Sequence, residues 1–150
     1  MKKRPTQPSN KHFWMEQTTT APPQAIWKQW ASVSTWKAWD TGLKDAYLEG
    51  AFELGAKGYI LTLQNQKIPF EITSYEEGKQ FTYATKLPLG RLVVAHYFLP
   101  HTQATTFVHE VWLEGFSAPF FALLLGRSFR KMLGPVLITL QQIAEQDELS

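Results

Sequence analysis

The sequence predicts an α+β fold in which a seven-stranded antiparallel sheet curves around one long C-terminal helix. Seven strand-like segments follow one another, mostly with short loops, and this order is typical of an antiparallel meander. After the last strand, apolar residues recur at steps of three and four from Pro119 to about Gln146, which indicates a helix with one buried stripe. At roughly 1.5 Å per residue this helix reaches about 40 Å, so it must lie across the sheet and can enclose a cavity with it.

The N-terminal elements are predicted as one strand followed by two short helices. Lys11–Thr19 alternates in the manner of a strand, and Thr20 can cap a helix whose first turn accommodates Pro22 and Pro23. A short second helix or turn then carries Trp36. Glycine, proline and asparagine residues separate the six strands that follow. These strands are predicted at Leu43–Glu49, Lys57–Gln64, Lys67–Tyr75, Gln80–Leu87, Arg91–Leu99 and Thr105–Glu114.

Length and charge indicate one domain with a short tail. The chain has 150 residues, enough for one sizeable core and too few for two. Lys2, Lys3, Arg4 and Lys11 place basic charge at the N-terminus, whereas the remainder is slightly acidic. Residues 1–10 are therefore predicted as a disordered basic tail, and residues 11–150 as a single domain. Four cations in a tail are a weak signal for a polyanion, so no nucleic-acid partner is expected.

Several kinds of chemistry are excluded by what the sequence lacks. The chain has no cysteine, which removes disulfides, thiolate nucleophiles, cysteine zinc sites and iron–sulfur clusters. A phosphate loop, a dinucleotide fingerprint and a serine-hydrolase elbow are also absent from the sequence, so no cofactor is expected. The basic start runs into polar residues, unlike a signal peptide, and no apolar run is long enough to cross a bilayer. We therefore expect a cytoplasmic protein without a transmembrane segment.

Several short runs of sequence resemble a known superfamily. These runs are Ala21–Trp27, Trp36–Asp40, Glu49–Gly58, Thr105–Phe107, Glu114–Gly115, Gly126–Arg127 and Ala144–Glu145. In this order and spacing, which spans about residues 12–146, they resemble the START-like (SRPBCC) superfamily and, more narrowly, its polyketide cyclase/dehydrase and lipid-transport branch. The resemblance implies a helix-grip (START/Bet v 1-like) fold, in which the sheet grips the long helix. It also implies a ligand such as a sterol, lipid, polyketide or plant hormone, which some members cyclise or dehydrate.

Two histidines form the candidate chemical site. The two strands before the long helix should form a hairpin, and pairing Phe98 with Phe107 places His96 opposite His109 on the face turned towards the helix. Such a pair can move a proton or polarise a carbonyl, and we predict both histidines as catalytic acid/base candidates. Two alternatives compete: each histidine is a hydrogen-bonded core residue, or both face solvent. Since zinc needs a third protein ligand, no metal is expected.

Other inward-facing residues are predicted to line the ligand cavity. Aromatic residues make up 14% of the chain, which suits an apolar ligand site and equally suits a large aromatic core. Tyr59 and Tyr83 carry hydroxyls that can orient a polar ligand group or, alternatively, bond to a core carbonyl. Asp40 is interpreted as a turn former rather than an acid catalyst. The predicted ligand-binding set is Tyr59, Phe70, Phe81, Tyr83, Val94, Phe98, Phe107, Val111, Phe129, Leu133 and Leu137.

Three functions follow, in decreasing order of support. The first is a binding module that holds a hydrophobic small molecule between the sheet and the long helix. The second is a cyclase or dehydratase that acts on a polyketide-like ligand in the same cavity through His96 and His109. The third is an interaction protein that docks a membrane or partner through Phe116–Leu125, and this one predicts an exposed apolar patch.

Overall fold

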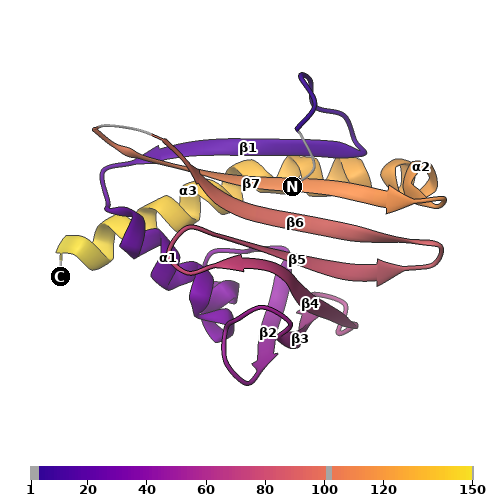
Figure 1. Cartoon of the computed structure of the whole chain (residues 1–150), viewed down its shortest axis with the longest axis horizontal. Helices are drawn as coiled ribbons and strands as arrows, with labels where there is room; N and C mark the ends of the chain where they lie inside the picture. The colour runs from indigo at the N-terminus through magenta and orange to yellow at the C-terminus, as the bar shows by residue number, and fades with distance from the viewer. Residues whose placement is uncertain (1–3, 101–102, 150) are drawn as a thin grey trace.

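The computed structural model describes residues 4–100 and 103–149 and shows one long helix packed along a curved sheet (Figure 1). Two short helices follow the first strand: α1 and the 3-10 helix η1. The last helix is preceded by a short helix, α2, and a π-helical turn, η2. In chain order the elements are β1 (His12–Thr19), α1 (Pro23–Ala31), η1 (Val33–Ala38), β2 (Leu43–Glu49), β3 (Lys57–Thr62), β4 (Lys67–Glu76), β5 (Gln80–Leu87), β6 (Gly90–Leu99), β7 (Thr105–Gly115), α2 (Ala118–Phe121), η2 (Ala122–Gly126) and α3 (Arg127–Leu149).

The sheet confirms the predicted antiparallel topology. Its seven strands lie in the order β1-β7-β6-β5-β4-β3-β2, and every neighbouring pair is antiparallel. Each strand from β2 to β6 pairs with the next along the chain, as expected for short loops, and β1 pairs with β7. No helix within residues 4–100 and 103–149 is long and apolar enough to cross a membrane.

The main core lies between the inner face of the sheet, which faces α1 and α3, and these helices. Ile26 and Trp30 of α1, Phe107 of β7 and Leu140 of α3 are fully buried in one cluster. A hydrogen bond holds η1 next to α1: the Nε1–H of Trp36 donates to the backbone carbonyl of Trp30 at 2.9 Å. The two short helices therefore close one side of the space between sheet and long helix.

The last helix differs from the prediction at its start. A single helix with one buried stripe was expected from Pro119, but the π-helical turn η2 separates α2 from α3. A π turn holds one residue more than an α turn, which changes the direction of the following side chains by about 100°. Phe120 and Leu124, predicted as part of the stripe, are therefore 61% exposed, whereas Leu133, Leu137 and Leu140 of α3 are buried as predicted.

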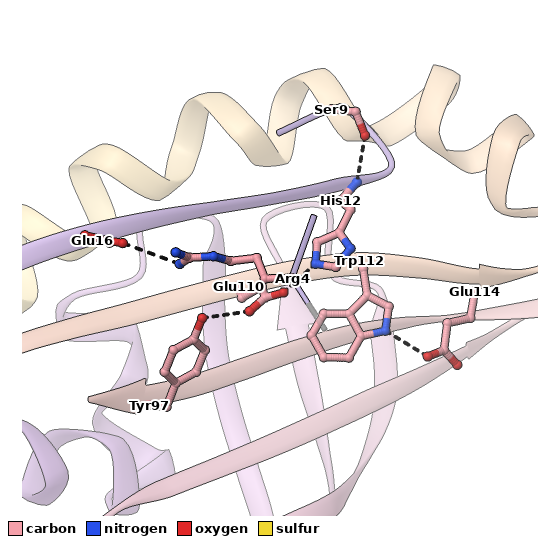
Figure 2. Close-up of polar contacts among 8 residues, drawn as sticks. All are labelled: Arg4, Ser9, His12, Glu16, Tyr97, Glu110, Trp112 and Glu114. Atoms are coloured by element: carbon pink, nitrogen blue, oxygen red, sulfur yellow. Dashed lines mark hydrogen bonds and ion pairs between the residues drawn. The ribbon is translucent and has the colours of Figure 1, made fainter. Parts of the chain in front are cut away.

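The outer face of the sheet carries a buried carboxylate. Glu110 of β7 is only 2% exposed. One of its oxygens pairs with Nε2 of His12, and the other accepts a hydrogen bond from the Tyr97 hydroxyl at 2.8 Å (Figure 2). Arg4 lies nearby, with its guanidinium 4.7 Å from the centre of a Trp14 ring. The two hydrogen-bonded partners offset the cost of removing this carboxylate from water.

The N-terminal segment contacts the domain within the part that the structure describes. Of the predicted disordered tail, residues 1–3 lie outside the described residues. Arg4 donates a hydrogen bond to Glu16 at 3.4 Å (Figure 2), and Asn10 accepts one from Arg130 at 3.2 Å. The Asn10 carbonyl lies 2.3 Å from where a Cβ would stand on Gly126, so this helix position accommodates only glycine without a shift of the backbone.

Removing the Tyr97 hydroxyl is expected to destabilise the domain. In Tyr97→Phe one oxygen of the buried Glu110 carboxylate loses its donor, and the free energy of unfolding should fall by about 1–3 kcal/mol. Tyr47→Phe is the matched control, because Tyr47 is exposed and should change stability by less than about 0.5 kcal/mol. Urea titration of the three proteins measures both values, and equal stability of the two variants would contradict the role given to Tyr97.

Candidate functional site

A cavity of about 170 Å³ lies between the sheet, the η1 region and α3. Its wall is mostly apolar and also contains the two histidines and a few other polar residues. The sheet contributes Leu43, Ile60, Thr62, Ile68, Tyr83, Thr85, Leu92, Val94, His96, His109 and Val111; the other lining residues are Trp36, Trp39, Asp40, Gly42, Phe129, Met132, Leu133 and Val136. An apolar wall with a small polar focus is the usual composition of a small-molecule site.

The two histidines face each other across the β6–β7 hairpin. The register pairs Phe98 with Phe107 and His96 with His109, which confirms the predicted pairing. The imidazole ring centres lie 4.5 Å apart with an angle of 68° between the planes. Both side chains are buried and both line the cavity.

Neighbouring groups determine which nitrogen of each ring carries the proton. The indole N–H of Trp30 donates to Nε2 of His109 at 3.0 Å, so neutral His109 holds its proton on Nδ1. The carbonyl of Phe81 lies 3.3 Å from Nδ1 of His96 and can only accept, so His96 donates from Nδ1 and keeps a lone pair on Nε2. Among the described residues, neither remaining nitrogen has a hydrogen-bond partner. The pair therefore offers a ligand one acceptor and one donor.

Both histidines are neutral at pH 7. Burial lowers the pKa of His109 to about 3. Burial and the proximity of His109 lower the pKa of His96 well below its usual range, against a smaller opposite effect of the Phe81 carbonyl. Desolvation disfavours the imidazolium because the apolar wall replaces its hydration shell. Two neutral rings can exchange hydrogen bonds with a ligand without burying a charge.

One residue of the cavity wall, Trp39, has a buried indole N–H without a partner among the described residues. Trp39 is 2% exposed and lines the cavity, yet its Nε1–H makes no hydrogen bond within the part of the chain that the structure describes. Its ring lies 5.9 Å from that of His109, centre to centre. A buried donor without an acceptor costs about 1–3 kcal/mol, so an acceptor placed there would be favourable.

Asp40 and Tyr83 also belong to the polar part of the wall, together with Thr62 and Thr85. Burial raises the pKa of Asp40, and the backbone N–H of Gly42, 2.9 Å from its Oδ1, opposes this rise. That hydrogen bond is the turn contact expected from the sequence. Burial, and then the negative charge of Asp40, raise the pKa of Tyr83, so its hydroxyl stays protonated at neutral pH.

The structure brings seven of the sequence-predicted site residues together at the cavity: His96, His109, Tyr83, Val94, Val111, Phe129 and Leu133. Phe81, which stacks on His96 with ring centres 4.0 Å apart, and Phe70, Phe98, Phe107 and Leu137 lie in the core around the cavity and do not form its wall. Tyr59 is a correction: its ring packs on Tyr47, and the next residue, Ile60, lines the cavity instead. Alternation along β3 therefore directs Tyr59 to the outer face.

Several lining residues were missed by the sequence analysis. Trp36, Trp39 and Met132 line the cavity but were not in the predicted ligand-binding set. Asp40 was assigned to a turn alone. The signal that could have identified the two tryptophans is their clustering before β2. A short helix packed against a curved sheet directs its side chains into the space between the sheet and the long helix.

Comparisons with known proteins show the fold. No family model and no curated protein matches the chain. Among solved structures, protein NE0264 from Nitrosomonas europaea is similar with a TM-score of 0.71 at 12% identity, over 95% of this chain and 99% of that one. The di-domain ARO/CYC StfQ of the steffimycin biosynthetic pathway has a TM-score of 0.69 at 11% identity, over 93% of this chain and 52% of that one.

A third similar structure contains small aromatic molecules. It is norcoclaurine synthase from Thalictrum flavum in complex with dopamine and hydroxybenzaldehyde, with a TM-score of 0.67 at 9% identity, over 91% of this chain and 87% of that one. At these identities the similarity concerns the fold. Together with the seven-stranded sheet and the gripped C-terminal helix, it shows that the chain has the helix-grip fold.

Proposed function

We propose that this protein binds a small apolar molecule that carries a carbonyl or a similar acceptor oxygen. The observation that supports this most directly is the buried, unpartnered N–H of Trp39, a residue that lines an apolar cavity. The ligand oxygen accepts from this N–H, and a ligand hydroxyl can donate to Nε2 of His96. Specificity then comes from a few polar groups, and most of the affinity comes from apolar burial.

The size of the cavity favours one ring with a short substituent. A cavity of about 150 Å³ lined by apolar side chains holds benzene in another protein, and this one measures about 170 Å³. A lipid tail or a multi-ring polyketide needs more space, which would require movement of lining side chains. Met132 is the flexible member of the wall and the one most able to make that space. Of the two single-ring molecules named in the norcoclaurine synthase structure, hydroxybenzaldehyde carries a carbonyl and is of the proposed class.

Catalysis of the cyclase or dehydratase type is the second candidate. The donor–acceptor pair of His96 and His109 and the fold similarity to StfQ support it. In such an enzyme Nε2 of His96 would take a proton from the ligand, and Nδ1–H of His109 would donate a hydrogen bond to the oxygen that gains charge. A strongly lowered pKa makes an imidazole a weak base, which is why binding is placed first.

Acetophenone and isopropylbenzene test the binding proposal, since they differ by one oxygen in place of one methyl group. We expect acetophenone to bind about 2- to 10-fold more tightly, the value of one net hydrogen bond. Binding should also shift the indole N–H resonance of Trp39 downfield in proton–nitrogen NMR spectra, and isopropylbenzene should not. Affinities come from the same titrations.

Trp39→Phe is the matched variant, because it removes the N–H and keeps an aromatic wall. It should abolish the preference for acetophenone and retain binding of isopropylbenzene. A preference that survives in Trp39→Phe, or a wild-type protein that binds neither compound, would refute the proposal. If the protein is an enzyme, His96→Gln should lose turnover of a polyketide-like substrate and keep acetophenone binding.

A further inference from the structure

One end of the molecule exposes a group of large apolar side chains. Leu89, Phe116, Phe120, Leu123 and Leu124, named here the apolar tip, are each 61–95% exposed. Leu89 lies in the β5–β6 turn, and its carbonyl accepts a hydrogen bond from the Ser117 backbone N–H at 3.3 Å, so the turn sits directly beside the start of α2. In Figure 1 the β5–β6 turn, the end of β7 and α2 lie at the same end of the molecule. Five exposed large side chains on adjoining segments form a patch that soluble surfaces seldom carry without a partner.

Basic residues adjoin the apolar tip and acidic ones are scarce. From Gly115 to Ala144 the sequence contains no aspartate or glutamate, but it contains Arg127, Arg130 and Lys131. These three exposed cations line one shallow depression together with Asn10. The first of them, Arg127, follows Leu124, the last residue of the tip, by three positions. The exposed side chains of Lys86 and Arg91 flank the β5–β6 turn, where Arg91 is paired with Glu114. This end of the molecule thus has an apolar tip and, next to the tip, a positively charged surface formed by Arg127, Arg130 and Lys131.

We infer that the apolar tip docks on an anionic phospholipid bilayer. The exposed phenylalanine and leucine side chains enter the boundary between headgroups and acyl chains, and Arg127, Arg130 and Lys131 meet the anionic headgroups. A second copy of the chain is the other obvious occupant. Two copies that met tip to tip would bring their cations together without an acid in the segment to neutralise them, so the charge pattern favours the bilayer.

The docking surface is separate from the ligand cavity but lies on the same helical segment. None of the five tip residues lines the cavity, and the first residue of the C-terminal helices that lines it is Phe129 in α3. Docking would therefore bring the cavity close to the membrane, and the side chains that line the cavity would not contact the bilayer. The inference stands whether or not the cavity binds the ligand proposed above.

Vesicle co-sedimentation of the full chain tests the inference. We expect binding to vesicles of phosphatidylcholine mixed with phosphatidylglycerol, weaker binding to phosphatidylcholine alone, and loss of binding as salt increases. The triple variant Phe116→Ser, Phe120→Ser and Leu123→Ser should bind at least about tenfold more weakly. Arg127→Gln with Lys131→Gln should weaken binding to the anionic vesicles by about 10- to 30-fold, about fivefold per charge, and should reduce its salt dependence.

The control exchanges exposed apolar residues elsewhere on the molecule. Tyr47→Ser, Leu54→Ser and Ile138→Ser remove the same number of exposed side chains away from the tip and should leave vesicle binding unchanged. Thermal melts check that each variant is folded. Absence of binding to the anionic vesicles, or equal binding by the two triple variants, would overturn the inference. A dimer in light scattering that only the tip variant abolishes, without vesicle binding, would assign the surface to a second copy and would also overturn it.

Discussion

Replacing Trp30 by alanine is expected to lower the free energy of unfolding by about 3–5 kcal/mol. Trp30 is completely buried, and its ring lies 4.9 Å from that of Phe98 and 5.6 Å from that of His96, centre to centre. The substitution leaves a cavity among these rings and also removes the N–H that bonds to His109. Since domains of this size are stable by about 5–15 kcal/mol, urea unfolding should show a marginally stable protein.

Two further variants distinguish how much ring packing and the hydrogen bond of Trp30 each contribute to the free energy of unfolding. Trp30→Phe keeps much of the ring volume and loses the hydrogen bond, so it should cost less than alanine but should free Nε2 of His109. Trp27→Ala is the control in the same helix, where the side chain is only partly buried and the cost should be smaller. A loss of less than about 1 kcal/mol in Trp30→Ala would show that the core does not depend on this residue.

Acid is expected to destabilise the domain through His109. Its pKa is about 3 in the folded protein and about 6.5 in an unfolded chain, so the unfolded state binds more protons between these values. Stability is therefore complete above about pH 6.5 and decreases as the pH falls towards 3. At pH 4.5 the loss from this residue is on the order of 3 kcal/mol, since pH 4.5 lies about two units below the pKa of the unfolded chain. The lowered pKa of His96 acts in the same direction.

Substitution of the histidine identifies its share of the acid sensitivity. His109→Gln keeps an acceptor for Trp30 and cannot be protonated, so the difference in unfolding free energy between pH 7 and pH 4.5 should shrink by about 2–3 kcal/mol. His12→Gln changes a histidine on the opposite face of the sheet and should leave the contribution of His109 in place. An unchanged pH dependence in His109→Gln would mean that the ring is not held neutral in the folded state.

The sequence predicted the hairpin register because both strands are long and end at a short loop. Pairing of two bulky residues, Phe98 and Phe107, was then enough to bring His96 and His109 together. Their protonation could not be predicted, because the donor to His109 is Trp30, which lies 79 positions earlier in the chain. Contacts of that kind depend on how α1 packs against the sheet, which local periodicity does not encode.

Two predictions failed for identifiable physical reasons. In β3 both faces are apolar, with Tyr59 and Leu61 on one side and Ile60 on the other, so alternation gives no sign of which face is buried. At the start of the last helix, steps of three and four extend through Phe120 and Leu124, but the spacing cannot reveal a π turn. The exposure of this segment was anticipated only by the docking hypothesis for Phe116–Leu125.

The π-helical turn η2 separates the helical phase of the tip from that of the cavity wall. In a continuous α-helix the direction of one side chain determines the direction of every other. A rotation that reorients the tip would therefore rotate the cavity-lining side chains by the same angle. The extra residue in η2 resets this relation, and deleting one residue there would rotate α2 by about 100° relative to α3. The apolar tip and the cavity wall can therefore change independently, the tip by substitution within α2 and the wall by substitution within α3.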